Sequence, residues 1–316
     1  MFEKEDRWLR ETYVDCLLDA AAKDERIVLL EADLSKAAGT GRFKQTYPDR
    51  LVNVGIAEAN MVGVAAGMSA MGKIPFTHTF TAFATRRCCD QVTLSVAYAG
   101  LNVKLMGSDP GVTAELNGGT HMSMEDVAIM RNIPGMTIYE PVDSVQLRAI
   151  FPQIVEAPGP VYIRLLRRNA VKVYEEGTPF TLGKGTMLKE GSDVTIIASG
   201  ILVAEAVKAA EALKAEGIDA EVINIHTIKP LDEEMVLASA KKTGAVVTAE
   251  NHNIIGALGG AVSEFLSENY PVPVVKVGVK DHFGEVGSTD FLMDKYGLRA
   301  ANIVEAARKA VSMKNR

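Results

Sequence analysis

One glutamate in this sequence lies where a charged side chain is costly. Glu58 belongs to the segment Asn53–Gly72, which is made almost wholly of small and apolar residues and whose pattern predicts a helix over Ile56–Met71. A buried carboxylate is strongly unfavourable unless another group pairs with it. Two interpretations remain open: Glu58 lies in an exposed first helical turn, where the helix dipole favours it, or its carboxylate faces a partner with which it shares a proton.

Two phenylalanines and a histidine follow Glu58 along the chain. Phe80 and Phe83 are three residues apart and share one helical face or turn. The stretch Gly107–Thr120 is rich in glycine and leads directly to His121. Long ordered loops in compact domains are usually functional. Each of these residues also has an ordinary interpretation, the phenylalanines as core and the histidine as a structural residue with satisfied hydrogen bonds.

A cluster of arginines follows the apolar run Val161–Leu165, in the segment RLLRRN. Arg164 and Arg167 lie close to the end of this predicted strand. The forked guanidinium group is suited to phosphate, although clustered arginines often form only a solvated edge.

The elements that position these residues alternate between short apolar runs and amphipathic helical segments. In the second half, for example, Val194–Ala198 predicts a strand and Val203–Glu216 a helix. Such alternation predicts βαβ units and a mostly parallel sheet with helices on both faces. Ligands of such α/β sheets bind beyond the carboxyl ends of the strands.

The length of 316 residues favours two domains. The segment 171–190 is rich in Gly, Lys and Glu without either period, so we expect a linker there. We therefore predict an α/β protein with one domain over residues 1–170 and a second over 191–316.

The composition excludes several classes of partner. With 34 Lys and Arg against 40 Asp and Glu, the net charge is −6, which predicts no nucleic-acid or anionic membrane surface. The N-terminus has no signal-peptide pattern, and no apolar run is long enough to span a bilayer. Cys16, Cys88 and Cys89 suggest no disulfide framework and no metal-ligand spacing. We expect a cytoplasmic protein with reduced thiols.

In sequence, the segments GIAEANMVGVAAG, TFTAF, the glycine-rich loop ending GGTH, and YIRLLR resemble the pyrimidine-binding domain of transketolases. The segments VINIHTIKPLD and TAENHNIIGALGGAVSE resemble the C-terminal domain of transketolases, deoxyxylulose-phosphate synthases and 2-oxo acid dehydrogenase beta subunits. The resemblance covers essentially the whole chain. It implies that the chain is the C-terminal subunit of a split transketolase, which transfers a two-carbon ketol unit between sugar phosphates, as in the pentose phosphate pathway.

The resemblance implies that thiamine diphosphate is the cofactor and that Glu58 hydrogen-bonds its aminopyrimidine ring. Phe80 and Phe83 match the aromatic positions that hold this ring. Larger transketolases often have a further aromatic residue one turn later, where this chain has Arg86-Arg87. Asp33 matches an aspartate near the cofactor.

The substrate residues are implied in the same way. His121 matches a histidine that contacts substrate oxygens near the reacting carbon, and Arg167 a phosphate-binding arginine, with Arg164 as the nearby competitor. Asn117 stands in place of an aspartate that contacts a sugar hydroxyl, and Met122 in place of a glutamine. These two departures leave the identity of the ketose donor open.

The GDG segment that usually holds the diphosphate and its divalent metal is missing from this chain. We therefore expect Mg²⁺ or another divalent cation, and the diphosphate, to be held by an N-terminal transketolase subunit, in an α2β2 heterotetramer. The glycines of Gly256–Gly260 open a predicted helix, and we expect them to serve close helix–sheet packing. No residue of this chain is expected to ligate the metal.

Two alternatives remain at this point. The chain could be a beta subunit of a 2-oxo acid dehydrogenase or part of an enzyme like deoxyxylulose-phosphate synthase. It could also be a non-catalytic α/β ligand-binding paralogue, which the departures at Asn117 and Met122 would favour.

Overall fold

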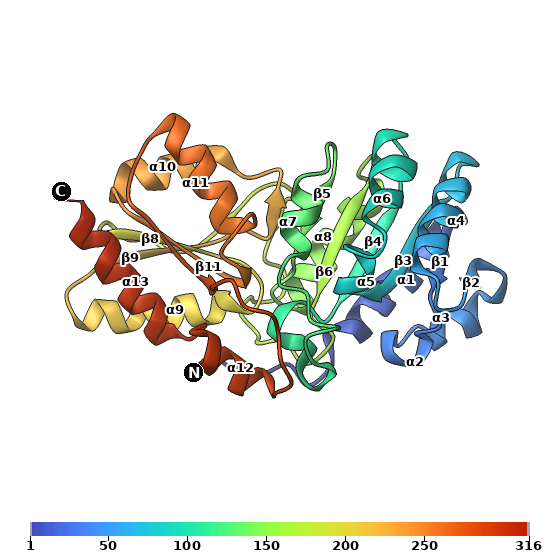
Figure 1. The fold of residues 1–316 in the computed structure, drawn as a ribbon, viewed down its shortest axis with the longest axis horizontal. Coiled ribbons are helices and arrows are strands. Elements are labelled where there is room, and N and C mark those ends of the chain that lie inside the picture. The colour runs from blue at the N-terminus through green and yellow to red at the C-terminus, as the bar shows by residue number, and fades with distance from the viewer. Residues whose placement is uncertain (1, 315–316) are drawn as a thin grey trace.

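The computed structural model describes residues 2–314, which form two α/β domains side by side (Figure 1). The first sheet has seven strands. In spatial order they are β10 (Thr227–Lys229), β5 (Thr137–Tyr139), β6 (Val161–Leu165), β4 (Lys104–Ser108), β3 (Ile74–Phe80), β1 (Ile27–Glu31) and β2 (Leu51–Asn53). The pairings are parallel except that of β10 with β5. Strands such as β1, β3 and β4 are buried along their whole length, because helices cover both faces.

The second sheet has five strands and is also mostly parallel. In spatial order they are β12 (Val274–Val279), β11 (Val246–Asn253), β8 (Val194–Ala198), β9 (Ala220–Asn224) and β7 (Thr186–Lys189). The edge strand β7 pairs antiparallel with β9 and lies within the segment 171–190 that we expect as the linker. The predicted fold class, two α/β domains with mostly parallel sheets, is confirmed.

Helices surround both sheets. Those of the first domain are α1 (Leu9–Lys23), α2 (Ser35–Ala38), α3 (Gly41–Thr46), α4 (Glu58–Ala70), α5 (Thr81–Ala84), α6 (Cys89–Gln91), α7 (Asp126–Arg131) and α8 (Ser144–Glu156), with the 3₁₀ turns η1 (Pro48–Arg50) and η3 (Gly111–Asn117) and the π-helical segment η2 (Val92–Tyr98). Those of the second are α9 (Leu202–Ala215), α10 (Glu233–Thr243), α11 (Leu258–Asn269), α12 (Thr289–Tyr296) and α13 (Ala300–Met313). None of the helices within residues 2–314 combines the length and hydropathy that crossing a lipid bilayer requires.

Local sequence explains several helix ends. The side chain of Asp232 accepts a hydrogen bond from the backbone N–H of Met235 at the start of α10, and Gly244 ends this helix in the left-handed conformation. The segment Ala82–Ala99 does not form one continuous helix, because the backbone leaves the helical region at Thr85 (φ −112°, ψ −85°). The hydroxyl and the N–H of Thr85 both donate to the carbonyl of Thr81, and this back-bonding often bends helices.

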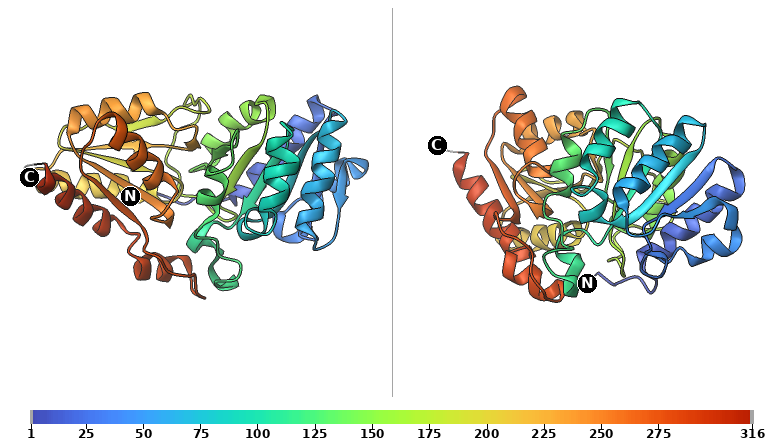
Figure 2. Two further views of the ribbon diagram at one scale, coloured as in Figure 1. Left: turned by 45° about the horizontal axis from the view of Figure 1, so that its top comes forward. Right: turned by 45° about the vertical axis from the view of Figure 1, so that its right-hand side comes forward.

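The two domains are joined by more than the chain between them. Strand β10 comes from the second half of the sequence but completes the edge of the first sheet, where Thr227 pairs with Tyr139. Helix α12 also packs against η3, and the two lie side by side in both views of Figure 2. A Cβ atom on Gly119 would lie 2.3 Å from the carbonyl oxygen of Gly284, which requires glycine at this contact.

Candidate active site

Most of the functional residues expected from the sequence follow the carboxyl ends of three neighbouring strands. Phe80, Ser108 and Leu165 are paired across β3, β4 and β6, so the residues that follow them start from one edge of the sheet. This is the edge at which parallel α/β sheets bind ligands.

Glu58 is the first residue of α4 and its side chain is only 2% exposed. The interpretation of an exposed first turn is therefore wrong. The hydroxyl of Thr79 donates to Oε1 at 3.3 Å, and Nη1 of Arg87 donates to Oε2 at 2.7 Å. The Arg87 side chain is 43% exposed, so the buried carboxylate is paired with a side chain that reaches the surface.

Three rings form a cluster that Arg87 connects to Glu58. The centroids of Phe80 and Phe83 are 6.1 Å apart, and the imidazole of His121 lies 5.8 Å from Phe80 and 5.0 Å from Phe83, all edge to face. The guanidinium carbon of Arg87 lies 3.8 Å above the ring of Phe83, in a cation–π contact. The structure therefore brings these five residues into one group.

Arg86 and Arg87 stand where larger transketolases often have a further aromatic residue, and the two arginines make different contacts. Arg86 points to the glycine-rich loop, where Nη1 donates to Glu125 at 2.9 Å and Nη2 donates to the carbonyl of Thr120 at 2.8 Å. It therefore fixes the backbone directly before His121. The sequence indicated neither of these contacts; it showed only that Arg86 and Arg87 follow the pair Phe80 and Phe83.

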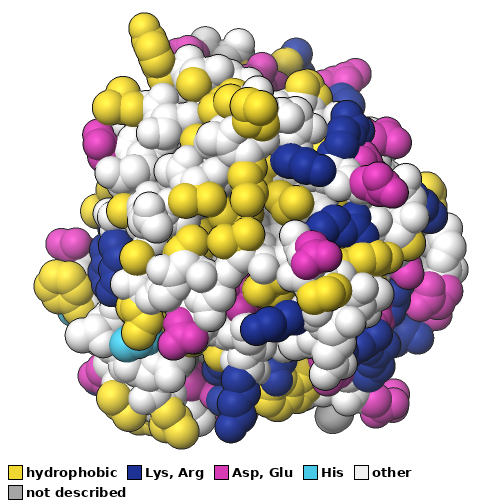
Figure 3. Space-filling view, turned by 90° about the vertical axis from the view of Figure 1, so that its right-hand side faces the viewer, with side chains coloured by type: hydrophobic (Ala, Val, Ile, Leu, Met, Phe, Trp, Pro, Cys, Tyr) yellow, Lys and Arg dark blue, Asp and Glu magenta, His cyan; other side chains and the backbone are white. Residues whose placement is uncertain are grey.

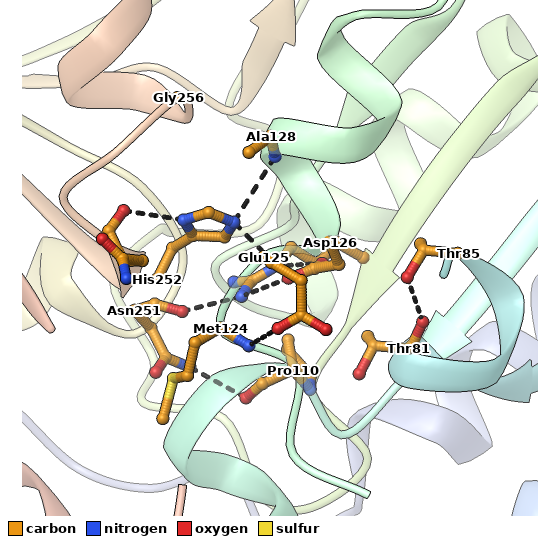
Figure 4. Close-up of polar contacts among 12 residues, drawn as sticks. Thr81, Thr85, Pro110, Met124, Glu125, Asp126, Ala128, Asn251, His252 and Gly256 are labelled. Atoms are coloured by element: carbon orange, nitrogen blue, oxygen red, sulfur yellow. Dashed lines mark hydrogen bonds and ion pairs between the residues drawn. The ribbon is translucent and has the colours of Figure 1, made fainter. Parts of the chain in front are cut away.

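The start of the glycine-rich loop is fixed by the second domain, a role that sequence reasoning missed. Asn251, near the end of β11, donates from Nδ2 to the carbonyl of Pro110 at 2.9 Å (Figure 4). Its Oδ1 accepts from the N–H of Val112, also at 2.9 Å. Gly111 has φ of +51°, and a Cβ there would lie 2.3 Å from Oδ1 of Asn251. The segment TAENHN thus positions the loop that carries His121.

The two departures from the family pattern lie in different surroundings. Asn117 is exposed at the end of η3. Met122 is 2% exposed, and a Cβ on Gly284 would lie 2.3 Å from its sulfur. Met122 therefore packs against the second domain. His121 lies between these positions, with Nδ1 2.9 Å from the hydroxyl of Thr120.

Arg164 is not free to bind a phosphate, so the prediction of Arg164 as an alternative to Arg167 for phosphate binding is wrong. Its side chain is 1% exposed and forms ion pairs with Asp126 at 2.7 Å and Glu140 at 2.5 Å. Nη2 also donates to the carbonyl of Asn251 at 2.7 Å. The carboxylate of Asp126 accepts a further hydrogen bond from Tyr162 at 2.8 Å. Arg164 is thus the centre of a buried network that joins the two domains.

Arg167 lines an open cavity of about 450 Å³. Its guanidinium carbon lies 5.7 Å from the ring centroid of Phe80, so we call this space the cavity beside Phe80. The cavity lining includes Trp8, Arg10, Asp33, Lys36 and Arg167. Asp33 has a left-handed backbone (φ 60°), held by Asn53, whose side-chain oxygen accepts from the backbone N–H of Asp33 at 3.0 Å. The structure therefore places Asp33 and Arg167 on the same cavity.

The glycines at the start of α11 serve close packing, as expected. A Cβ on Gly259 would lie 2.7 Å from the hydroxyl of Thr248. The buried carboxylate of Glu250 accepts the N–H groups of Leu258 at 2.8 Å and Gly259 at 2.9 Å, so an internal group already uses this helix N-terminus. Burial raises the pKa of Glu250 to about 7. Within residues 2–314 no group of three or more His, Cys, Asp or Glu side chains is arranged to hold a metal ion.

Comparison with known proteins covers both domains. Residues 8–172 match the family model "Transketolase, pyrimidine binding domain", and residues 183–303 match "Transketolase, C-terminal domain". The 6-deoxy-6-sulfo-D-fructose transketolase subunit SqwH of Clostridium sp. (strain MSTE9) is 68% identical, over 98% of this chain and 97% of that protein. An apulose-4-phosphate transketolase subunit of Phocaeicola vulgatus is 38% identical, over 96% of this chain and 97% of that protein.

A solved structure agrees with these matches. The structure described as "Split gene transketolase, inactive beta4 tetramer" superposes with a TM-score of 0.89 at 47% identity, over 97% of this chain and 99% of that chain. The chain therefore belongs to the transketolase family and corresponds over nearly its whole length to the C-terminal subunit of split transketolases.

Proposed function

We propose that this chain provides the pyrimidine-binding half of the active site in a two-subunit transketolase that uses thiamine diphosphate. The observation that carries the proposal is the buried carboxylate of Glu58, which Arg87 links to the ring of Phe83 and so to its neighbours Phe80 and His121. A carboxylate in such surroundings favours a protonated ring nitrogen on its partner, and the phenylalanine rings offer edge and face contacts to a flat heterocycle. These residues fit the pyrimidine ring of the cofactor.

In the proposed mechanism Glu58 accepts a hydrogen bond from the ring nitrogen of the pyrimidine and holds a proton on that atom. Arg87 must then leave Oε2, to which it now donates at 2.7 Å. Bound thiamine diphosphate supplies the nucleophilic carbon that carries the two-carbon unit. His121 hydrogen-bonds substrate oxygens near the reacting carbon, and its Nδ1 contact with Thr120 orients the ring.

Arg167, Asn117 and Asp33 complete the proposed site. Arg167 and Asp33 lie on the cavity beside Phe80, which suits the charged end of a sugar and the cofactor edge respectively. Asn117, exposed on the glycine-rich loop, is proposed to contact a sugar hydroxyl. An acyclic sugar must extend from the reacting carbon near His121 toward Arg167.

We propose that a separate N-terminal subunit holds the diphosphate and the divalent cation, in an α2β2 assembly. Hydrophobic side chains gather on the end of the molecule where α4 lies (Figure 3). Exposed there are Ile56 at 78%, Met71 at 84%, Leu94 at 55% and Tyr98 at 88%. Exposed apolar patches often mark protein contacts, and Ile56 precedes Glu58 by two residues.

We also propose that the chain consists of a first domain, a linker and a second domain, over residues 1–170, 171–190 and 191–316. The proposed location is the cytoplasm. The free state of Cys16, Cys88 and Cys89 supports a reducing compartment.

The proposed donor is a ketose with an anionic group at the end remote from the carbonyl. The named substrates of two relatives, 6-deoxy-6-sulfo-D-fructose and apulose 4-phosphate, have such an end group. The donor is therefore not confined to the sugar phosphates of the pentose phosphate pathway.

The test is to reconstitute the chain with a partner subunit that contains the GDG segment, and to add thiamine diphosphate and Mg²⁺. We expect transfer of a two-carbon unit from 6-deoxy-6-sulfofructose or fructose 6-phosphate to glyceraldehyde 3-phosphate. Activity on pyruvate with a lipoyl acceptor would instead show the 2-oxo acid dehydrogenase alternative. A complex that binds no cofactor would show the non-catalytic alternative.

Replacement of His121 by asparagine is expected to lower kcat/KM for ketol transfer by roughly 10–100-fold, the effect of losing one buried hydrogen bond to substrate. The variant should keep its affinity for thiamine diphosphate, because the proposed contacts of His121 are with the sugar. Steady-state kinetics and a cofactor titration check both parts. Unchanged kinetics would remove His121 from the site.

A further inference from the structure

The most unusual group near the site is Asp109, which directly follows β4. Its side chain is 0% exposed and its backbone is left-handed, with φ of 58°. Neither carboxylate oxygen accepts a hydrogen bond, although Nε of Arg167 lies 3.0 Å from Oδ2. A buried carboxylate that lacks hydrogen bonds and sits on a strained backbone is costly, and such costs are typical of functional positions.

The cavity beside Phe80 is lined by more cations than carboxylates. Its lining includes the cations Arg10, Lys36 and Arg167 and the carboxylate of Asp33. Burial and the nearby Arg167 lower the pKa of Arg10, so these two cations act on one another. Asp109 adds a second carboxylate behind Arg167.

Two neighbouring groups do not change this count. Arg168 is already paired with Glu115 at 2.7 Å. His78 is fully buried, which lowers its pKa to about 3 and leaves the ring neutral. Burial also raises the pKa of Asp109 to about 6, so the carboxylate is mostly ionised at neutral pH. Three cations therefore face two carboxylates, which leaves one net positive charge.

We propose that Asp109 determines specificity by matching the charge of the cavity beside Phe80 to a monoanion, so that the site selects a ketose with a terminal sulfonate over one with a terminal phosphate. The inference rests on the proposed function. A sulfonate carries one negative charge, whereas a phosphate monoester carries about −1.5 to −2 at pH 7. Asp109 repels the additional charge of the phosphate.

The position of Asp109 makes this repulsion effective. The side chain is buried and its backbone leaves the end of a central strand, so it cannot move away from a bound anion. Charge interactions across a partly buried site are screened less than on the surface. An unfavourable contact with the competing ligand is a common source of specificity.

The test is to replace Asp109 by asparagine in the enzyme reconstituted with its partner subunit. Asparagine has the same shape and tolerates a left-handed backbone, so the variant is expected to fold. We measure kcat/KM with 6-deoxy-6-sulfofructose and with fructose 6-phosphate as donors. The ratio of phosphate to sulfonate efficiency should rise by about 10-fold, which corresponds to one additional net positive charge at the site.

Asp281→Asn is the matched control, since Asp281 is an exposed aspartate with φ of 54° on the second domain. Its donor ratio should equal that of the wild type. An unchanged ratio in Asp109→Asn, with an active wild type, overturns the role of Asp109 and leaves the proposed function intact. If the wild type transfers from neither donor, the proposed function itself fails and the inference fails with it.

Discussion

Replacement of Glu58 by glutamine is expected to lower the turnover of the reconstituted enzyme by about 10²–10⁴-fold, the contribution of positioned proton transfer. Glutamine has nearly the same shape, so the contacts of α4 and the hydrogen bond from Thr79 can persist. The neutral amide, however, cannot stabilise a proton on the ring nitrogen. Single-turnover and steady-state rates measure the loss.

The control for this variant is Glu211→Gln, which makes the same change on the exposed face of α9. It should leave turnover unchanged. The Glu58 variant should also unfold at a temperature close to that of the wild type, so that its loss of rate is not a loss of fold. Near-normal turnover in a complex saturated with thiamine diphosphate would contradict the assignment of Glu58.

Replacement of Arg164 by methionine is expected to reduce the free energy of unfolding by about 3–5 kcal/mol, because it leaves buried carboxylates without their cation. Asp126 is fully buried, and Arg164 holds the pKa of its carboxyl below its usual value against the opposing effect of burial. Glu140 loses its cation as well and retains the hydroxyl of Ser199 at 2.8 Å. Urea or thermal unfolding measures the effect.

Arg148→Met is the matched control, since Arg148 is 41% exposed and lies 3.4 Å from Asp15. Loss of such a surface ion pair should cost less than about 1 kcal/mol. The Arg164 experiment also separates two roles: a phosphate-binding arginine would raise KM without lowering stability. A stable Arg164→Met variant with a raised KM would therefore contradict the structural role.

The sequence was sufficient for the fold class because buried strands and amphipathic helices alternate along most of the chain. It also singled out Glu58, since a carboxylate among small apolar residues is costly wherever the helix lies. The structure then places Phe83 and His121 together, although they are far apart in the sequence.

The remaining features depend on contacts that no periodicity encodes. Arg164 follows the same pattern as Arg167 in RLLRRN, but its position within β6 points it into the interface between the domains. Asn251 contacts the backbone at Pro110, and only the packing of the two domains brings them together. The edge strand β10 has only three residues, too few for a pattern to identify its partner.

The pairing of β10 with β5 also affects the order in which the chain can be completed during synthesis. The first domain is translated before Thr227–Lys229, so the outer edge of β5 stays unpaired while the ribosome adds ninety further residues, from position 140 to 229. An unpaired strand edge is a site for wrong associations between chains. The nascent first domain therefore passes through a stage in which its sheet is open on the side of β5.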